Sequence, residues 1–257
     1  MAPEHPTPPR LGSVHYLNAA PLTFGIEDQM VFATPARLAE LLRRDELDAA
    51  LVSITEVLLR DRYDILDGVA IAALGEVYSV LLAHKKPLAE VQEVFCDTAS
   101  LTSVNLLKVL LAERGLRPVF RPLESYAVAA EKDFVLLIGD PAIDFQRAAH
   151  THQIFDLGTE WRNLTRLPFV FAVWALRRGV EQRGNARKLR TAKANGLREL
   201  NQIIRQRPEH DEAFRRTYFE RHIRYDLNDV EKQAVARFCE LLLKHQLGPV
   251  FPPYYIF

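Results

Sequence analysis

The sequence of 257 residues contains little cysteine, no excess of either charge and no long hydrophobic run. Its two cysteines, Cys96 and Cys239, lie far apart, which excludes a CxxC metal or redox motif and a disulfide framework. The 33 basic and 33 acidic residues cancel, whereas nucleic-acid-binding domains usually carry a basic surplus. The longest apolar runs, such as 70–74 and 169–176, are too short to cross a bilayer. We therefore expect a globular protein with neither a nucleic-acid nor a membrane partner.

Signal, nucleotide and metal motifs are missing as well. Met1–Arg10 is rich in proline and has no hydrophobic stretch, so we expect no secretory signal, a disordered lead-in and a cytoplasmic location. No GxGxxG, GxxxxGK[ST], GxSxG or HExxH motif occurs. His150 and His152 lack a third ligand at zinc spacing, and we expect them to pack rather than bind metal. The sequence thus predicts neither a metal nor a cofactor.

Strands and helices alternate over the first two thirds of the chain, and helices dominate the last third. Thr34 and Pro35 form a typical helix start, with threonine as the N-cap. The expected strands are 11–17, 48–52, 70–74, 79–83, 94–96, 119–121, 134–138 and 169–176. The expected helices are those that start at residue 35 and those at 54–59, 103–114, 142–149, 185–207 and 229–245. This order predicts an α/β fold with a mixed, mostly parallel sheet in each of two halves.

Polar residues follow several of the expected strands. In open α/β sheets, ligands bind beyond the carboxyl ends of the strands. The side chains predicted at these ends are Asn18, Ser53, Ser79, the run Asp97–Ser103, Gly139 and Asp140. Most of them carry hydroxyl or amide groups rather than charge. This composition favours a small polar ligand, above all a carboxylate, held by hydrogen bonds.

The run Asp97–Ser103 is the strongest of these candidates. It joins a strand to a helix, so it presents free backbone N–H groups and hydroxyls at a helix N-terminus, which attract anions. The alternative is helix capping alone, by Thr102 or Ser100. Asn18 either contacts a ligand or closes an Asx-turn. Asp140 is a base, a ligand contact or the N-cap before Pro141.

Six segments, in this order, resemble the chorismate dehydratase family of the futalosine route to menaquinone. They are VHYLNAAPL (14–22), LDAALVS (47–53), GEVYSV (75–80), DTASLTSV (97–104), IGDPA (138–142) and DLGTEW (156–161), the last followed by LPFVFAVWA (167–175). Each segment alone is a weak signal, but six in series are specific. The resemblance extends from about residue 11 to residue 175.

The resemblance implies a two-lobed fold like that of type II periplasmic-binding proteins. Lobe one would comprise 1–87 and 176–257, and lobe two would comprise the inserted 88–175, which agrees with a crossing at Lys85–Pro87. The implied substrate is chorismate, bound between the lobes and dehydrated to 3-[(1-carboxyvinyl)oxy]benzoate without metal or cofactor. The implied enzyme is a hydro-lyase, either a monomer or a homodimer.

The resemblance also assigns roles to residues of this chain. Ser100, Thr102 and Ser103 would hold a carboxylate, and Asn18 and Ser79 would position the ring or its hydroxyl. The base would be either the enolpyruvyl carboxylate of the substrate or Asp140. The further predicted substrate contacts are Tyr16, Ser53, Gly139 and Phe169.

Departures from the family pattern leave alternatives open. Ala99 and Leu101 stand where relatives often have serine and arginine, so a carboxylate would rely on neutral groups or on a distant cation such as Arg147 or Arg162. One alternative function is that of the related 1,4-dihydroxy-6-naphthoate synthase, whose family usually reads Asn-Asp-Thr-Phe where this chain reads Asn18-Ala-Ala-Pro. Another is a non-catalytic solute-binding protein, which would need an export signal.

Overall fold

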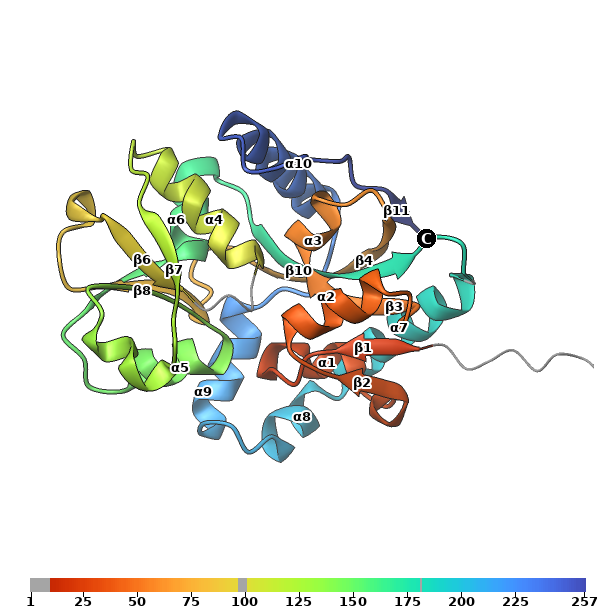
Figure 1. Cartoon of the computed structure of the whole chain (residues 1–257). Coiled ribbons are helices and arrows are strands. Elements are labelled where there is room, and N and C mark those ends of the chain that lie inside the picture. The colour runs from red at the N-terminus through yellow and green to blue at the C-terminus, as the bar shows by residue number, and fades with distance from the viewer. Residues whose placement is uncertain (1–9, 97–100, 181) are drawn as a thin grey trace, which may run out of the picture.

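The computed structural model describes residues 10–96, 101–180 and 182–257, which form two lobes, each with its own sheet flanked by helices (Figure 1). The predicted disordered lead-in lies outside these residues. The first sheet has the strand order β11-β4-β10-β3-β1-β2. Its strands are β1 (Leu11–Ser13), β2 (Met30–Phe32), β3 (Ala49–Ser53), β4 (Tyr63–Ala73), β10 (Phe169–Arg177) and β11 (Tyr255–Ile256).

The second sheet has the strand order β7-β6-β8-β5-β9. Its strands are β5 (Val80–His84), β6 (Glu93–Cys96), β7 (Val119–Pro122), β8 (Phe134–Ile138) and β9 (Gln153–Asp156). The fully apolar strand predicted at 134–138 is confirmed with the same bounds, because all five of its residues are buried. Both ends of the described chain lie in the first lobe.

The chain crosses between the lobes earlier than the sequence predicted. β5 already pairs with β8 and β9 of the second sheet, so the first crossing is the segment 74–79 rather than Lys85–Pro87. The return also differs, since β10 pairs with β3 and β4 although 169–175 was assigned to lobe two. Lys85–Pro87 is a polar turn after β5, whereas Val77, in the true crossing, is buried like the core.

The strand that follows each crossing is antiparallel to its neighbours. β10 runs against β3 and β4, and β5 runs against β8 and β9. The pairs β1–β2, β1–β3, β4–β11, β6–β7 and β6–β8 are parallel. A chain that enters a sheet at the edge where the other strands end must run back against them. The carboxyl ends of most strands in both sheets therefore face the junction between the lobes.

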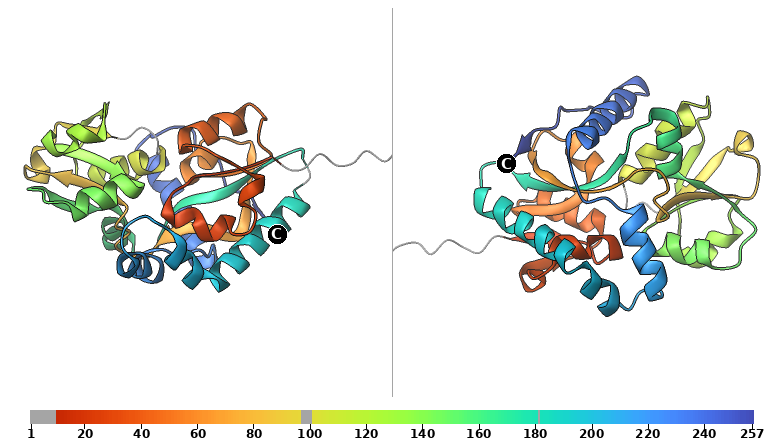
Figure 2. Two further views of the ribbon diagram at one scale, coloured as in Figure 1. Left: turned by 90° about the horizontal axis from the view of Figure 1, so that it is seen from below. Right: turned by 180° about the vertical axis from the view of Figure 1, so that it is seen from behind.

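The helices cover both sheets (Figure 2). Those of the first two thirds are α1 (Ala20–Thr23), α2 (Pro35–Arg43), α3 (Ile54–Leu58), α4 (Leu101–Ala112), α5 (Gly139–Arg147) and α6 (Leu157–Thr165). Those of the last third are α7 (Arg183–Arg198), α8 (Leu200–Gln206), α9 (Glu212–Thr217), the π-helical turn η5 (Tyr218–His222) and α10 (Asp229–Lys244). Thr34 caps α2 as predicted, by accepting a hydrogen bond from the Arg37 backbone N–H.

Several predicted elements differ from the observed ones; for example, the strand expected at 70–74 is the last part of β4. The strand expected at 11–17 ends at Ser13, and Leu17–Ala19 forms a 3₁₀ turn that leads into α1. The helix expected at 185–207 is divided at Glu199 into α7 and α8. α7 packs closely against α1 at Gly196, because a Cβ on this residue would lie 2.1 Å from the Pro21 carbonyl oxygen of α1.

One hydrophobic core extends through both lobes. Trp161 of α6, Phe169 of β10 and Phe238 of α10 form an edge-to-face aromatic cluster at the back of the junction, with ring centroids 5.0 to 5.9 Å apart. Cys96 is buried, Cys239 is partly buried, and the two form no disulfide with each other. The His150 ring stacks on Phe145, which agrees with the packing role expected for it. No helix in the described ranges combines the length and apolar character that a bilayer crossing requires.

Candidate functional site

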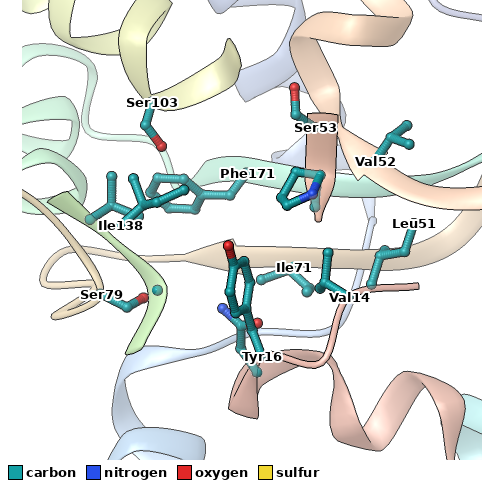
Figure 3. Close-up of a pocket in the computed structure, with 15 residues that line it drawn as sticks. Val14, Tyr16, Leu51, Val52, Ser53, Ile71, Ser79, Ser103, Ile138 and Phe171 are labelled. Carbon is teal, nitrogen blue, oxygen red and sulfur yellow. The ribbon is translucent and has the colours of Figure 1, made fainter. Parts of the chain in front are cut away.

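A cavity lies at the junction of the lobes, where the strand ends of both sheets meet (Figure 3). The space between its walls, open solvent included, is about 580 Å³. Its walls are Val14, Tyr16, Asn18, Pro35, Leu51, Val52, Ser53, Ile71, Ser79, Val80, Ser103, Ile138, Gly139, Phe171 and Ala172. Both lobes therefore contribute, as expected for a ligand held between them.

The polar groups of this cavity are neutral. Among the described residues, its walls contain no Asp, Glu, Lys, Arg or His side chain. Tyr16, Asn18, Ser53, Ser79 and Ser103 supply its hydroxyl and amide groups, and Figure 3 shows Tyr16 and Ser103 projecting toward the space between the lobes. Binding in such a site depends on hydrogen bonds and dipoles rather than on ion pairs.

The helices α4 and α5 begin at the cavity wall. Ser103 lies in the first turn of α4, and Gly139 is the first residue of α5. The first four N–H groups of a helix lack intrahelical partners and carry a partial positive charge. These two helix starts make the neutral cavity attractive to an anion such as a carboxylate.

A buried hydrogen-bond chain connects Asn18 with Ser79. The Asn18 Nδ2 donates to the Tyr218 hydroxyl over 3.3 Å, and that hydroxyl donates to Ser79 Oγ over 2.8 Å. The Tyr225 hydroxyl donates to the Asn18 backbone oxygen over 2.9 Å. The Asn18 Oδ1 atom is buried and has no hydrogen-bond partner among the described residues. Asn18 lines the cavity, so a bound ligand is the partner that this buried acceptor lacks within the described residues.

Tyr218 is a component of this site that the sequence reasoning missed. It is 1% exposed and comes from η5, beyond the last of the motif segments that form the walls. Burial raises the pKa of its hydroxyl well above the ordinary range, and the hydrogen bonds to Ser79 and Asn18 offset only part of that shift. The available signal was its residue type, because a buried tyrosine hydroxyl usually has a hydrogen-bond partner.

The crossing segment positions Ser79. The Asp156 carboxylate accepts hydrogen bonds from the backbone N–H groups of Val77 and Tyr78 at 2.9 to 3.2 Å, and it also caps α6. Gly158 allows α6 to approach this segment, because a Cβ there would lie 2.2 Å from the Gly75 carbonyl oxygen. The family-like segments 75–80 and 156–161 are thus one structural unit that holds Ser79.

Thr102 lies next to the cavity but does not line it. Its hydroxyl accepts from the Thr55 backbone N–H at 3.0 Å and lies 2.9 Å from Ser53 Oγ and 3.0 Å from Thr55 Oγ1. Thr102 is 1% exposed, so α4 of the second lobe is joined here to the start of α3 in the first. The structure places Ser53 and Ser103 in the wall and Thr102 behind it. Ser100 lies outside the described residues.

Tyr16 and Gly139 meet across the cavity. Gly139 has φ +61°, a conformation that L side chains rarely adopt, and an added Cβ would lie 3.3 Å from the Tyr16 ring. Its backbone N–H donates to the Ser79 carbonyl oxygen over 2.7 Å. Glycine is required here because the β8–α5 turn is left-handed and the tyrosine ring of the other lobe covers it.

Besides Thr102, two predicted site residues are not among the wall residues. Asp140 lies in the first turn of α5, whose N-cap position is Ile138, so it is not the cap of that helix. Burial, with a contribution from Glu209, raises the pKa of its carboxyl. Phe169 is 1% exposed within the aromatic cluster, and the phenylalanine that lines the cavity is Phe171.

The distant cations also lie elsewhere. Arg147 pairs with Asp211 at 2.5 Å, and the Arg162 guanidinium would lie 3.3 Å from a Cβ on Gly75 of the crossing segment. Neither arginine is among the wall residues. Within the described ranges, no group of three or more His, Cys, Asp or Glu side chains is arranged to hold a metal ion.

Comparisons with known sequences agree with the motif segments. The family model described as "Menaquinone biosynthesis" matches residues 9–244. A curated relative, chorismate dehydratase of Thermus thermophilus, is 34% identical over 268 residues, which cover 95% of this chain and 98% of the relative. The match therefore includes the helical last third, where Tyr218 is located.

Solved structures confirm the fold. Protein AF1704 from Archaeoglobus fulgidus matches with a TM-score of 0.75 and 17% identity, over 93% of this chain and 98% of that one. The alkanesulfonate-binding protein SsuA from Xanthomonas axonopodis pv. citri, bound to MOPS, matches with a TM-score of 0.67 and 14% identity over 93% of each chain. The periplasmic aliphatic sulphonate binding protein SsuA from Escherichia coli gives 0.60 and 14%, over 96% and 93%.

The fold is therefore the periplasmic-binding-protein-like fold that the resemblance implied. Fold similarity at these identities does not assign a function. The family model and the curated relative each cover most of the chain, the six motif segments included. The chain belongs to the menaquinone-biosynthesis family.

Proposed function

We propose that the protein is a hydro-lyase that converts chorismate to 3-[(1-carboxyvinyl)oxy]benzoate in the futalosine route to menaquinone, in the cytoplasm. The observation that carries this proposal is the convergence of separate motif segments on one neutral cavity. Asn18, Ser53, Ser79, Ser103 and Gly139 come from five of the six segments and all line that cavity. The relative from Thermus thermophilus supports the choice of substrate.

The ring carboxylate of chorismate would bind at the helix starts. Ser103 and the N-terminal N–H groups of α4 supply hydrogen-bond donors there, and the start of α5 lies on the same cavity. The ring hydrogen on the carbon that bears the enolpyruvyl ether is vinylogous to this carboxylate. When that hydrogen leaves as a proton, negative charge spreads onto the carboxylate, and donors already aimed at it stabilise the charge.

The hydroxyl on the neighbouring ring carbon is the leaving group. Asn18 Oδ1 offers it an acceptor and Ser79 Oγ a donor, so it would be held while its C–O bond breaks. The electron pair of the C–H bond enters the ring, and the pair of the C–O bond leaves with the hydroxyl. The proton and the hydroxyl together form water, and the ring becomes aromatic.

The base in this proposal is the enolpyruvyl carboxylate of the substrate itself. The described part of the cavity wall contains no carboxylate and no histidine, and Asp140, the other predicted base, lies outside it. A general base must come within hydrogen-bond reach of the proton that it removes. The neutral wall favours a substrate that brings its own base.

The test is to mix the purified protein with chorismate and to follow the ultraviolet spectrum and the product mass. We expect a product lighter by one water molecule. Ser79→Ala should lower kcat by about 10²-fold, the usual effect of losing one donor to a developing anion. Asp140→Asn should keep kcat within a few-fold of the unmodified protein.

Three outcomes would contradict this proposal. Unchanged chorismate over a range of pH would exclude the dehydratase. Binding of chorismate without conversion would identify a solute-binding protein. Loss of kcat by several orders of magnitude in Asp140→Asn, with binding retained, would make Asp140 the base and exclude the substrate carboxylate.

A further inference from the structure

The hydrogen-bond chain through Tyr218 has a direction. The Tyr218 hydroxyl has a single proton, which it donates to Ser79 Oγ, so toward Asn18 it can only accept. The Asn18 amide therefore turns its Nδ2 to Tyr218, and its Oδ1 stays without a partner among the described residues of the site. The flipped amide would leave both amide hydrogens without a partner, which is worse than one unpaired acceptor.

The same chain leaves the Ser79 proton available to a ligand. Ser79 Oγ accepts from Tyr218, and its remaining contact within the described residues is the Val77 carbonyl oxygen at 3.5 Å, the limit of a hydrogen bond. The cavity thus presents an unpaired acceptor beside an available donor. This pair matches a hydroxyl group, which donates through its hydrogen and accepts through its oxygen.

We propose that Tyr218 is a positioning residue that orients Asn18 and Ser79 as a receptor for the leaving hydroxyl of the substrate. The proposal rests on the proposed function and assigns to the helical last third a role in the reaction. Tyr218 touches no substrate atom, because it is buried behind Asn18 and Ser79 and is not a wall residue.

The environment of Tyr218 suits a fixed donor rather than an acid. Burial raises the pKa of its hydroxyl, so the neutral O–H form persists throughout the working pH range. Its ring stacks on Phe214 with centroids 5.7 Å apart, which fixes the direction of the hydroxyl. A proton taken from Tyr218 would leave a tyrosinate in the core, so its contribution is orientation.

The test compares Tyr218→Phe with Tyr63→Phe. Both substitutions remove only a hydroxyl from a tyrosine that is 1% exposed, and the Tyr63 hydroxyl has no hydrogen-bond partner among the described residues. With chorismate, Tyr218→Phe should lower kcat/KM about tenfold, the size of one net hydrogen bond, with a fall in kcat as well as a rise in KM, because the hydroxyl is held both in the bound substrate and as it leaves. Tyr63→Phe should change neither. In a Ser79→Ala background, Tyr218→Phe should cause a smaller loss than in the unmodified protein, since part of its effect passes through Ser79 and only the part through Asn18 remains.

A binding measurement separates this inference from the proposed function. Calorimetry would compare benzoate with 4-hydroxybenzoate, whose hydroxyl lies opposite the carboxylate like the leaving hydroxyl of chorismate. The unmodified protein and Tyr63→Phe should prefer the hydroxylated probe, and Tyr218→Phe should lose that preference. If the unmodified protein leaves chorismate unchanged, the proposed function fails. The ratio of the affinities for 4-hydroxybenzoate and benzoate still decides whether Tyr218 orients Asn18 and Ser79.

Three results would overturn the role of Tyr218. They are an unchanged kcat and probe preference in Tyr218→Phe, a change confined to KM, and an additive loss in the double variant with Ser79→Ala. An equal fall of activity and thermal stability in Tyr63→Phe would show that any buried hydroxyl matters, and would also reject the specific assignment.

Discussion

The two lobes touch on two sides of the cavity, and the two contacts are built differently. On the side of α3 and α4, Thr102 is buried and meets Ser53 and Thr55 through hydroxyl and backbone hydrogen bonds. On the side of α5 and α9, Arg147 pairs with Asp211 (Figures 1 and 2). The first contact is neutral and buried, and the second is charged and exposed to solvent.

Exposure decides what each contact contributes. Thr102 is 1% exposed, so a lost partner there leaves a buried N–H group unsatisfied. The Arg147 and Asp211 side chains are 38% and 55% exposed, and water screens an ion pair of that kind. The ion pair has the shorter distance, but we expect it to contribute less to stability than the hydrogen bonds of Thr102. Water competes for the exposed charges and not for the buried hydroxyl.

The largest effect is expected at the neutral contact. Thr102→Val keeps the shape of the side chain but removes the acceptor of the Thr55 N–H and the partner of Ser53. It should lower the free energy of unfolding by about 1 to 3 kcal/mol, the cost of an unsatisfied buried group. Urea denaturation measures it. Thr217→Val, whose hydroxyl bonds to its own helix at an exposed position, is the control and should change little. Equal losses of unfolding free energy in Thr102→Val and Thr217→Val would show that the neutral contact between the lobes has no special importance.

A smaller effect of opposite sign is expected from Asp140→Asn at the charged side. Because burial raises the folded-state pKa of Asp140, the ionised carboxyl costs stability, and that cost appears as pH rises through the folded pKa. The variant should therefore be more stable than the parent at neutral pH. The gain should vanish below the ordinary range of a carboxyl, where both states are protonated.

Urea denaturation across that pH range measures this difference. Asp28→Asn, on the exposed turn Glu27–Gln29, serves as the control and should show no such gain. A variant less stable than the parent at neutral pH would mean that the carboxylate is stabilised in place. The charged side would then resemble the neutral one in its dependence on a single buried group.

The smallest effect is expected from Arg147→Ala. The variant loses the ion pair with Asp211 and the contact of the guanidinium with the Phe214 ring, whose centroid lies 4.7 Å away. An exposed pair contributes at most about 1 kcal/mol. Denaturation at low and high salt should show that the loss shrinks as salt screens the charges. A loss larger than that of Thr102→Val would reverse the comparison of the two sides.

Much of the fold and of the site could be predicted from local sequence. The apolar strand 134–138 and the Thr34 cap depend on neighbouring residues alone, and both are confirmed. Ser53 reaches the cavity because it ends a strand whose carboxyl end faces the junction, and Asn18 and Ser79 reach it from the connections after β1 and before β5.

Other features depend on contacts that local patterns do not reveal. Phe169 and Phe171 are both buried in a strand covered on two faces, and register shifts interrupt its pairing with β4, so alternation could not tell which ring lines the cavity. The crossing at 74–79 could not be recognised as a connection between lobes, because Val77 is apolar and buried like a residue of the core. Asp140 looked like a site residue because it follows Gly139, but the helix that begins there turns it away from the wall.

The sequence by itself determined the alternation of strands and helices, the family and the neutral character of the cavity, because these depend on the order and type of nearby residues. Only the tertiary structure decided where the chain crosses between the lobes and which residue stands behind Asn18 and Ser79. Tyr218 reaches them across 200 and 139 positions of the chain. No local pattern specifies a hydrogen bond of that separation, because it exists only after both lobes and the helical last third have packed together.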